Sequence, residues 1–231
     1  AYHFGSRLQF ANDGTLFVSL GEGFKYMKDS QDPSITHGKI VRINTDGSIP
    51  VDNPFADGEA GAPAVWSYGH RNVQGLYYDA DTGTLYETEH GPKGGDELNL
   101  VTPGTNYGWP EITYGVNYDG TIITNKTEAE GMAQPLTYWV PSIAPSGLVM
   151  LTSDVYPGWK GDLFTGGMNG PAGLELTRID MENGEVVGKQ SLFDGEYPIR
   201  DVVQGPDGHL YVATKDFDGI FRVDIAEAEA E

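Results

Sequence analysis

A recurring hairpin plan constrains the fold of this 231-residue chain more than any other feature. Each copy reads as a strand, a turn containing Gly, Asn or Asp, a second strand with alternating apolar residues, and an acidic or glycine-bearing loop. Three copies and a weaker fourth follow this plan: residues 8–23, 76–92, 203–219 and, less clearly, 149–167. The turns need residues that tolerate positive φ, which these residue types supply. Residues 38–49 and 174–193 are further hairpin candidates.

Repeated hairpins are typical of a β-propeller, whose blades are four-stranded antiparallel sheets of roughly 40 to 50 residues. By that measure the chain holds about four to five blades. A β-sandwich shows the same alternation, so periodicity alone leaves the architecture open, and the regular return of the D-G-x-L-Y/F pattern favours the propeller. With 32 Gly, 14 Pro and few long helical patterns, we expect an all-β fold. The expected single domain covers residues 1–225, followed by an acidic tail at 226–231.

The formal charge of -20 argues against a nucleic-acid partner, because binding phosphates relies on Lys and Arg. An acidic surface suits high salt, solubility or divalent cations, and charge alone does not choose among them. No apolar run approaches the roughly 20 residues that span a bilayer, so no membrane span is expected. The chain contains no Cys and begins at Ala1 rather than Met, so we expect processing or trimming that hides any targeting signal.

Polar groups concentrate between residues 66 and 110, in two loops around a β-forming stretch. In the first loop, GHRNVQ, Arg71 offers a planar fork for carboxylate or carbonyl oxygens, and Asn72 and Gln74 add neutral amides. Such a set suits an anionic, oxygen-rich ligand. A purely structural network between Arg71 and the backbone fits the spacing equally well.

The second loop, EHGPKGGDELN, can bind a hard cation. A turn at Gly91 and Pro92 can aim successive backbone carbonyls at the cation, and Asp96 and Glu97 supply carboxylates. A ligand set made only of oxygen atoms favours Ca²⁺ over Zn²⁺. The spacing of an EF-hand loop is absent. A solvated acidic loop is the alternative interpretation.

Three isolated residues have a functional and a structural interpretation. His3, at a junction between loop and strand, could be a general base or a hydrogen-bonded structural histidine. Trp139 could stack on a sugar or belong to the core. Arg200, taken alone, is typical of a surface ion pair.

Taken together, the motifs resemble the soluble quinoprotein sugar dehydrogenases of the glucose/sorbosone dehydrogenase family, in particular the aldose sugar dehydrogenase branch. The matching strings run in family order along nearly the whole chain: HFGSRL, GKIVRIN, WSYGHRN, EHGPKGGDELNL, GTNYGWP, GVNYDGT, WVPSIAPSG, IRDV and QGPDGHLYV. The resemblance implies a six-bladed propeller that binds pyrroloquinoline quinone (PQQ) and Ca²⁺ and oxidises aldoses at C1 to lactones. It also implies an external electron acceptor and a periplasmic or secreted location.

The resemblance assigns roles residue by residue. His3 resembles the general base, and Arg200 resembles the arginine that faces the reacting quinone oxygens and binds the cofactor. The other implied contacts are Arg71 and Asn72 with PQQ, Gly91 and Pro92 with the Ca²⁺ that polarises the quinone, and Glu97 and Tyr107 with a second, structural calcium.

Three departures from the family pattern favour an alternative. Asn169 stands where the family has Lys, and Pro198 stands where it has Arg, so two counter-charges for the trianionic cofactor are absent. The family's first blades also have no counterpart here, so the chain is a fragment, closes with fewer blades, or uses a partner chain or a dimer to cover open sheet edges. The alternative function is a calcium-stabilised, non-catalytic module that binds glycan or protein.

Overall fold

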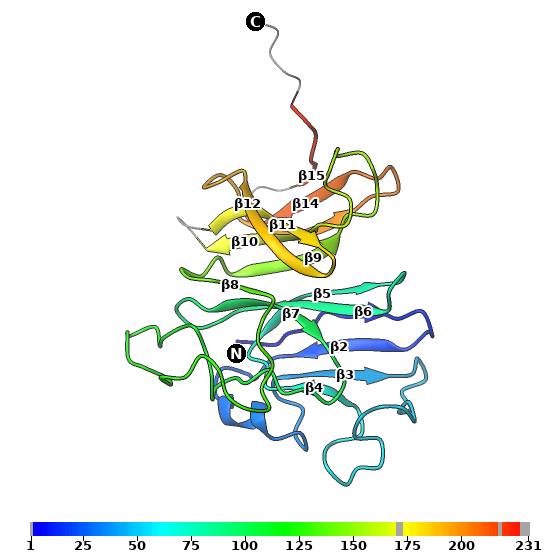
Figure 1. The fold of residues 1–231 in the computed structure, drawn as a ribbon, viewed down its shortest axis with the longest axis vertical. Helices are drawn as coiled ribbons and strands as arrows, with labels where there is room; N and C mark the ends of the chain where they lie inside the picture. The colour runs from blue at the N-terminus through cyan, green and yellow to red at the C-terminus, as the bar shows by residue number, and fades with distance from the viewer. Residues whose placement is uncertain (1, 170–172, 217–218, 227–231) are drawn as a thin grey trace, which may run out of the picture. The chain divides into compact units, whose positions relative to one another are not determined.

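The computed structural model describes residues 2–169, 173–216 and 219–226, which contain 15 β-strands and one 3-10 helix (Figure 1). The strands form four antiparallel sheets in chain order. The first sheet contains β1 (Leu8–Phe10), β2 (Leu16–Leu20), β3 (Lys39–Ile43) and β4 (Val65–Tyr68). The second sheet contains β5 (Val73–Asp79), β6 (Thr84–Glu89), β7 (Asp96–Val101) and β8 (Thr137–Trp139). The third sheet contains β9 (Pro145–Met150), β10 (Leu163–Asn169), β11 (Gly173–Glu182) and β12 (Glu185–Leu192). The fourth sheet contains β13 (Ile199–Gln204), β14 (Leu210–Thr214) and β15 (Ile220–Arg222). The helix η1 (Met27–Gln31) lies between β2 and β3.

Each sheet is a meander in which every strand pairs with its neighbour in sequence, the arrangement of a propeller blade. Three sheets have four strands, and the sheet from β13 to β15 has three within the described residues. The chain therefore has the expected all-β propeller fold, with four sheets described.

Most of the expected hairpins form. The repeats at 8–23, 76–92 and 203–219 are the pairs β1 with β2, β5 with β6, and β13 with β14. The pair β11 with β12 turns at Asn183 and Gly184, whose φ values of 53° and 82° explain the Asn-Gly sequence.

Two of the hairpin candidates differ from the expectation. The strands β9 and β10 are neighbours, but a long connection rather than a tight turn joins them. The hairpin expected at 38–49 is wrong, because after β3 and a turn at Gly47 the chain returns to the sheet only at Val65.

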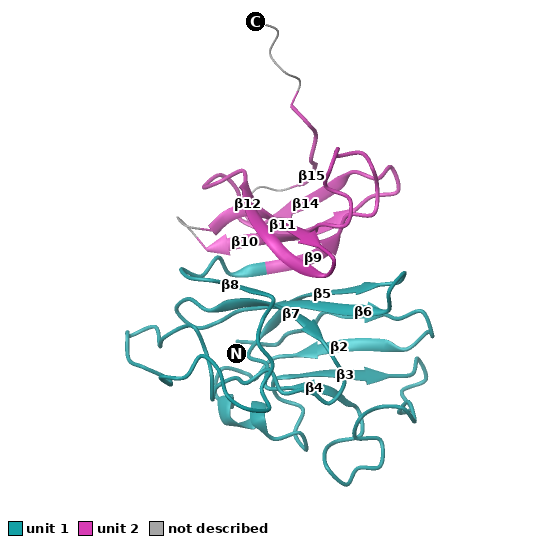
Figure 2. Cartoon of the chain, viewed as in Figure 1, with its two compact units in different colours: residues 1–145 teal, residues 146–231 magenta. Residues whose placement is uncertain are grey.

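The chain divides into two compact units, residues 1–145 and 146–231 (Figure 2). Seven buried residues form a core in unit 1. Six come from strands of the first two sheets and Tyr107 comes from the connection between β7 and β8: Phe17, Ile40, Val73, Leu76, Leu85, Val101 and Tyr107. In unit 2, Leu163, Leu176, Ile179, Ile199 and Leu210 are fully buried. A single domain over residues 1–225 stays a prediction, and the expected tail at 226–231 falls almost entirely outside the described residues.

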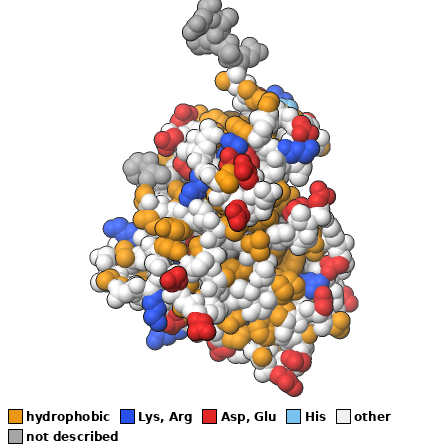
Figure 3. Space-filling model, in the orientation of Figure 1, with side chains coloured by type: hydrophobic (Ala, Val, Ile, Leu, Met, Phe, Trp, Pro, Cys, Tyr) orange, Lys and Arg blue, Asp and Glu red, His pale blue; other side chains and the backbone are white. Residues whose placement is uncertain are grey.

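Acidic side chains are scattered over the face drawn in Figure 3, in keeping with the formal charge of -20. Across the described ranges, no helix has the length and apolar character needed to cross a bilayer.

One buried carboxylate organises the loop after β6. Asp96 is fully buried at the start of β7, and its Oδ1 accepts a hydrogen bond from the Gly91 backbone N–H at 2.9 Å. Its Oδ2 accepts three more, from the Ser142 hydroxyl at 2.7 Å and from the backbone N–H groups of Ile143 and Ala144 at 2.8 and 2.9 Å. Burial raises the pKa of Asp96 to about 6, although these hydrogen bonds act to lower it. This single side chain therefore joins the loop at 91–95 to the loop at 142–144.

A buried lysine holds the segment around η1. The Lys39 ammonium is fully buried and donates to the backbone carbonyls of Asp29, Ser30 and His37 at 2.9, 3.0 and 2.6 Å. Burial lowers the pKa of Lys39 from 10.5 to about 8. The ammonium thus stabilises the connection between β2 and β3 without an anionic side chain in direct contact with it.

Replacing Asp96 by Ala should destabilise the chain by about 3–5 kcal/mol, because buried N–H groups lose their acceptor. Chemical denaturation measures the loss. Asp119→Ala is the matched control, since Asp119 accepts equivalent bonds from Thr121 in an exposed turn and its loss should cost only about 0.5–1 kcal/mol. Equal losses in the two variants would contradict the role given to Asp96.

The pH dependence of stability should report on Lys39. Between pH 8 and pH 10.5 the unfolded chain keeps a proton that folded Lys39 has lost, so this residue makes the free energy of unfolding rise with pH. The wild type should therefore gain about 1–3 kcal/mol relative to Lys39→Met between pH 7 and pH 10.5, measured by denaturant titration. Lys28→Met, at an exposed lysine of η1, should show no such trend. A difference that stays constant with pH would refute the assignment.

Candidate functional site

His3 is held against a buried carboxylate. The Nδ1 atom of its imidazole lies 2.5 Å from Oε1 of Glu22, and the two side chains are only 11% and 2% exposed. If Nδ1 carries the ring proton and donates it to Glu22, Nε2 is left as an unprotonated acceptor. This arrangement gives the imidazole the tautomer that a general base needs.

The backbone around His3 is unusual. His3 has a φ of 56°, in the left-handed region that residues other than glycine seldom adopt. The glycine at position 21 is required, because a Cβ there would overlap the His3 carbonyl group. Local strain of this kind is common where a side chain is positioned for function.

The imidazole of His3 lines an open pocket of about 660 Å³. The aromatic side chains around it are Tyr2, Phe4, Phe24 and Tyr26. Phe24 meets the His3 ring edge-on at 5.1 Å between centroids, and Tyr26 stacks on His37 at 4.6 Å. Aromatic faces beside polar imidazoles suit a ligand with both apolar and polar surfaces, such as a sugar ring.

Hydrogen bonds join two residues near His3 to the loop at 69–72. The Glu22 N–H donates to the Arg71 carbonyl at 3.0 Å, and the Gly5 N–H donates to Oδ1 of Asn72 at 3.2 Å. Both Arg71 and Asn72 are buried, at 4% and 5% exposure. The candidate base and the two candidate cofactor-binding residues are therefore neighbours within unit 1.

The guanidinium of Arg71 contacts the second predicted loop directly. Its Nη1 donates to the carbonyls of His90 at 2.9 Å and Gly91 at 2.6 Å, and the group lies 5.2 Å from the centre of the Trp109 ring. The predicted cofactor residue thus bonds to one of the two carbonyls expected to hold calcium. The sequence allowed Arg71 either to bind an anionic ligand or to form a structural network with the backbone. The structure contains the network with the backbone.

A small cavity of about 10 Å³ adjoins this network, which is room for about one water or one ion. Its lining includes Arg71, Glu89, Gly91, Gly95, Glu97 and Tyr107. Burial, followed by the charge of Glu89, raises the pKa of Glu97 to about 8. Carboxylates and carbonyls around one ion-sized space form a donor set that fits calcium.

Two of the expected metal ligands need refinement. Both oxygens of Asp96 accept hydrogen bonds within the fold, so its carboxylate has a structural role that the sequence did not predict, and its service to a cation stays a prediction. The Tyr107 hydroxyl donates to the Leu100 carbonyl at 2.6 Å and accepts from the Thr102 N–H at 2.9 Å. Only the main-chain carbonyl of Tyr107 is then left to serve as a calcium ligand.

Three of the remaining residues belong to unit 2 and one to unit 1. Arg200 is exposed on β13, Asn169 is exposed at the end of β10, and Pro198 is buried, all within unit 2. Trp139 is 7% exposed and sits at the end of β8, which agrees with the core interpretation.

Sequence reasoning missed Glu22 and Glu87. It placed His70 and Glu89 in the two polar loops but did not predict that they form a cluster with Glu87, in which one atom of each side chain lies within 4.8 Å of the others. Glu22 stands between two glycines in the loop after the first hairpin, a signal too common to single it out. Burial and the charge of Glu89 raise the pKa of Glu87 well above its ordinary value.

Comparisons with known proteins agree with this geometry. The profile of the Glucose / Sorbosone dehydrogenase family matches residues 1–223. The chain is 43% identical over 222 residues to aldose sugar dehydrogenase YliI of Escherichia coli (strain K12), covering 94% of this chain and 58% of that protein. The chain thus spans a little over half the length of this curated relative.

Solved structures give the same result. A crystal structure of a glucose dehydrogenase superposes with a TM-score of 0.92 at 40% identity, covering 98% of this chain and 65% of that one. The PQQ-bound form of aldose sugar dehydrogenase from Streptomyces coelicolor superposes with a TM-score of 0.73 at 33% identity, covering 99% of this chain and 60% of that one. With the fold, the motifs and the family profile in agreement, the chain belongs to the glucose/sorbosone dehydrogenase family.

Proposed function

We propose that this chain carries the catalytic base and much of the cofactor site of a PQQ- and calcium-dependent aldose dehydrogenase, which oxidises sugars at C1 to lactones and passes electrons to an external acceptor. The observation that supports this most directly is the hydrogen-bonded path from His3 through Glu22 and Arg71 to Gly91. It joins a candidate base to a candidate cation-binding carbonyl in one unit. The names of the E. coli and S. coelicolor relatives agree with this reaction class.

His3 would accept the proton of the C1 hydroxyl at Nε2. Glu22 would hold the imidazole in orientation and stabilise its positive charge once it is protonated, since the carboxylate is 2% exposed and poorly screened. The aromatic walls at Tyr2, Phe24 and Tyr26 would position the sugar ring and displace water from it.

The cofactor contacts come from the same network. When bound, PQQ supplies a two-electron acceptor for the hydride that leaves C1, and Ca²⁺ raises its electrophilicity. Arg71, Asn72 and Arg200 would contact PQQ, and the carbonyls of Gly91 and Pro92 would hold its Ca²⁺. Glu97 and the carbonyl of Tyr107 would hold a second calcium at the cavity beside them.

A second candidate function is a calcium-stabilised module that binds glycan or protein without catalysis. Arg71 is compatible with either function, because Nη1 of its guanidinium is bonded to two backbone carbonyls while its buried Nε has no hydrogen-bond partner. With Asn169 and Pro198 in place of cations, the counter-charge for a trianionic cofactor is lower than in the family.

Two sheet edges suggest a further partner. In unit 1, Leu8 and Phe10 of β1 are 64% and 58% exposed, and in unit 2, Ile220 and Phe221 of β15 are 73% and 47% exposed. Exposed apolar edge strands are prone to pair with another chain, so a partner chain or a dimer would cover them. Family resemblance adds a periplasmic or secreted location to the proposal.

Titrating PQQ into the purified chain at saturating Ca²⁺ separates the two candidates. The dehydrogenase proposal predicts one equivalent of bound PQQ by calorimetry, lost on adding EDTA, together with dye reduction when an aldose is present. Absence of PQQ binding under these conditions would leave the non-catalytic module as the function of this chain.

His3→Gln should lower turnover by about 10²–10⁴-fold, because a neutral amide cannot accept the hydroxyl proton. The affinity for PQQ should stay within about threefold of wild type, since Gln retains a similar size and polarity at that position. His209→Gln, at a partly buried histidine of unit 2, is the matched control and should leave both quantities unchanged. A parallel loss of turnover and PQQ binding would contradict the role of His3 as base.

A further inference from the structure

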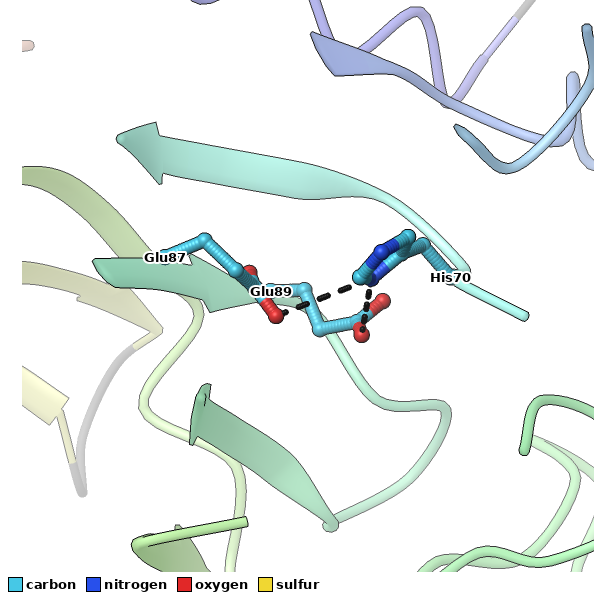
Figure 4. A group of neighbouring side chains, drawn as sticks. All are labelled: His70, Glu87 and Glu89. Carbon is cyan, nitrogen blue, oxygen red and sulfur yellow. Dashed lines mark hydrogen bonds and ion pairs between the residues drawn. The ribbon is translucent and has the colours of Figure 1, made fainter. Parts of the chain in front are cut away.

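Three buried side chains outside the His3 pocket face one another. Glu87 and Glu89 are two residues apart on β6, so both side chains leave the same face of the strand, and Figure 4 shows them directed at the ring of His70. Their exposures are 0%, 4% and 0% for Glu87, Glu89 and His70. Nδ1 of His70 lies 3.3 Å from Oε1 of Glu89 and 3.7 Å from Oε1 of Glu87. The first is a long hydrogen bond and the second lies beyond hydrogen-bond distance, since ordinary values are about 2.7–3.2 Å.

Other contacts orient each of these side chains from outside the cluster. Nε2 of His70 lies 2.8 Å from the Ser67 hydroxyl, which can accept the ring proton there and leave Nδ1 as an electron-pair donor. Oε2 of Glu89 accepts the backbone N–H groups of Arg71 at 2.5 Å and Asn72 at 3.2 Å, so Oε1 faces the cluster. Contacts of this kind are what hold metal ligands in position in proteins.

Glu87 carries an unsatisfied atom. The Asn99 amide donates to its Oε1 at 2.7 Å, but Oε2 is buried and has no hydrogen-bond partner. A buried carboxylate oxygen without a partner is costly. Figure 4 shows this carboxyl group directed at the ring of His70, with Oε1 as the oxygen 3.7 Å from Nδ1, so a cation between them would supply the charge that the buried carboxylate lacks.

The charge in this region is not balanced by basic side chains. Within the described ranges, no Lys or Arg forms an ion pair with Glu87 or Glu89, and the nearby Arg71 guanidinium donates to carbonyls instead. Two buried carboxylates beside one imidazole therefore need an added positive charge.

We propose that His70, Glu87 and Glu89 bind one divalent transition-metal cation of the Zn²⁺, Mn²⁺ or Co²⁺ class. One imidazole nitrogen and two carboxylate oxygens form a mixed donor set, which suits these ions better than the all-oxygen set preferred by calcium. The site differs in its donors from the calcium positions proposed at Gly91 and Pro92 and at Glu97 and Tyr107. Its role is structural, because it joins the loop at 69–72 to the end of β6, and it does not rest on the proposed dehydrogenase activity.

Metal uptake during refolding tests the site, since a fully buried cluster is loaded most readily as the chain folds. The chain is refolded with Zn²⁺ in excess Ca²⁺, without PQQ or sugar, freed of unbound metal and analysed by mass spectrometry. We expect one equivalent of retained Zn²⁺ in the wild type and at least tenfold less in Glu87→Gln. Glu175→Gln, at a buried glutamate of β11 that bonds to Thr177 and Ser191, is the matched control and should retain the metal.

X-ray absorption on the Zn²⁺-loaded wild type avoids any folding defect in the variant. The proposal predicts one imidazole nitrogen among the oxygen neighbours of the zinc. An all-oxygen shell, a wild type that retains no zinc, or equal uptake by Glu87→Gln would overturn the proposal and leave a shared proton between the two carboxyl groups. Because PQQ is absent from these measurements, their failure would leave the dehydrogenase proposal standing.

Discussion

The carboxylate of Glu89 is the contact on which the geometry of the candidate site depends. Its Oε2 accepts the backbone N–H groups of both Arg71 and Asn72, and these charge-assisted bonds lie in a buried region where they are strong. They hold the loop at 69–72 against the end of β6. From that position the Arg71 carbonyl reaches the Glu22 N–H, and its guanidinium reaches Gly91. A shift of this loop would therefore move the partner of His3 and a candidate calcium carbonyl together.

The same region concentrates negative charge in a poorly solvated space. Burial raises the pKa values of Glu87, Asp96 and Glu97, so each is harder to ionise than a surface carboxyl group. Four hydrogen bonds offset the cost of burying the Asp96 carboxylate, but no comparable set of hydrogen bonds surrounds Glu87 or Glu97 in the described residues. A bound cation or a retained proton is left to stabilise those two carboxyl groups, and two of the three proposed metal positions adjoin Glu89.

The sequence predicts the parts of this structure that depend on local pattern. Turn residues with alternating apolar neighbours predict the hairpins, as at Asn183 and Gly184, and ordered motifs predict the family. Partners remote in sequence could not be predicted. The structural role of Asp96 depends on its bonds to residues 142–144, and the hairpin expected at 38–49 fails because its partner strand begins only at Val65. Glu22 is ordinary in sequence and becomes informative only through its 2.5 Å contact with His3.

Glu89 also couples two of the three proposed cation positions, because it belongs to the cluster with His70 and Glu87 and lines the cavity beside Glu97. A cation in the cluster would neutralise part of the charge that a second cation in the cavity is attracted to, and the two cations would also repel each other. Binding at either position should therefore weaken binding at the other, with the same coupling free energy in both directions. The proposed calcium position in the cavity and the proposed transition-metal site are then linked through one carboxylate, so the proposal implies that the affinity of the cavity for calcium depends on whether the cluster holds a metal or a proton.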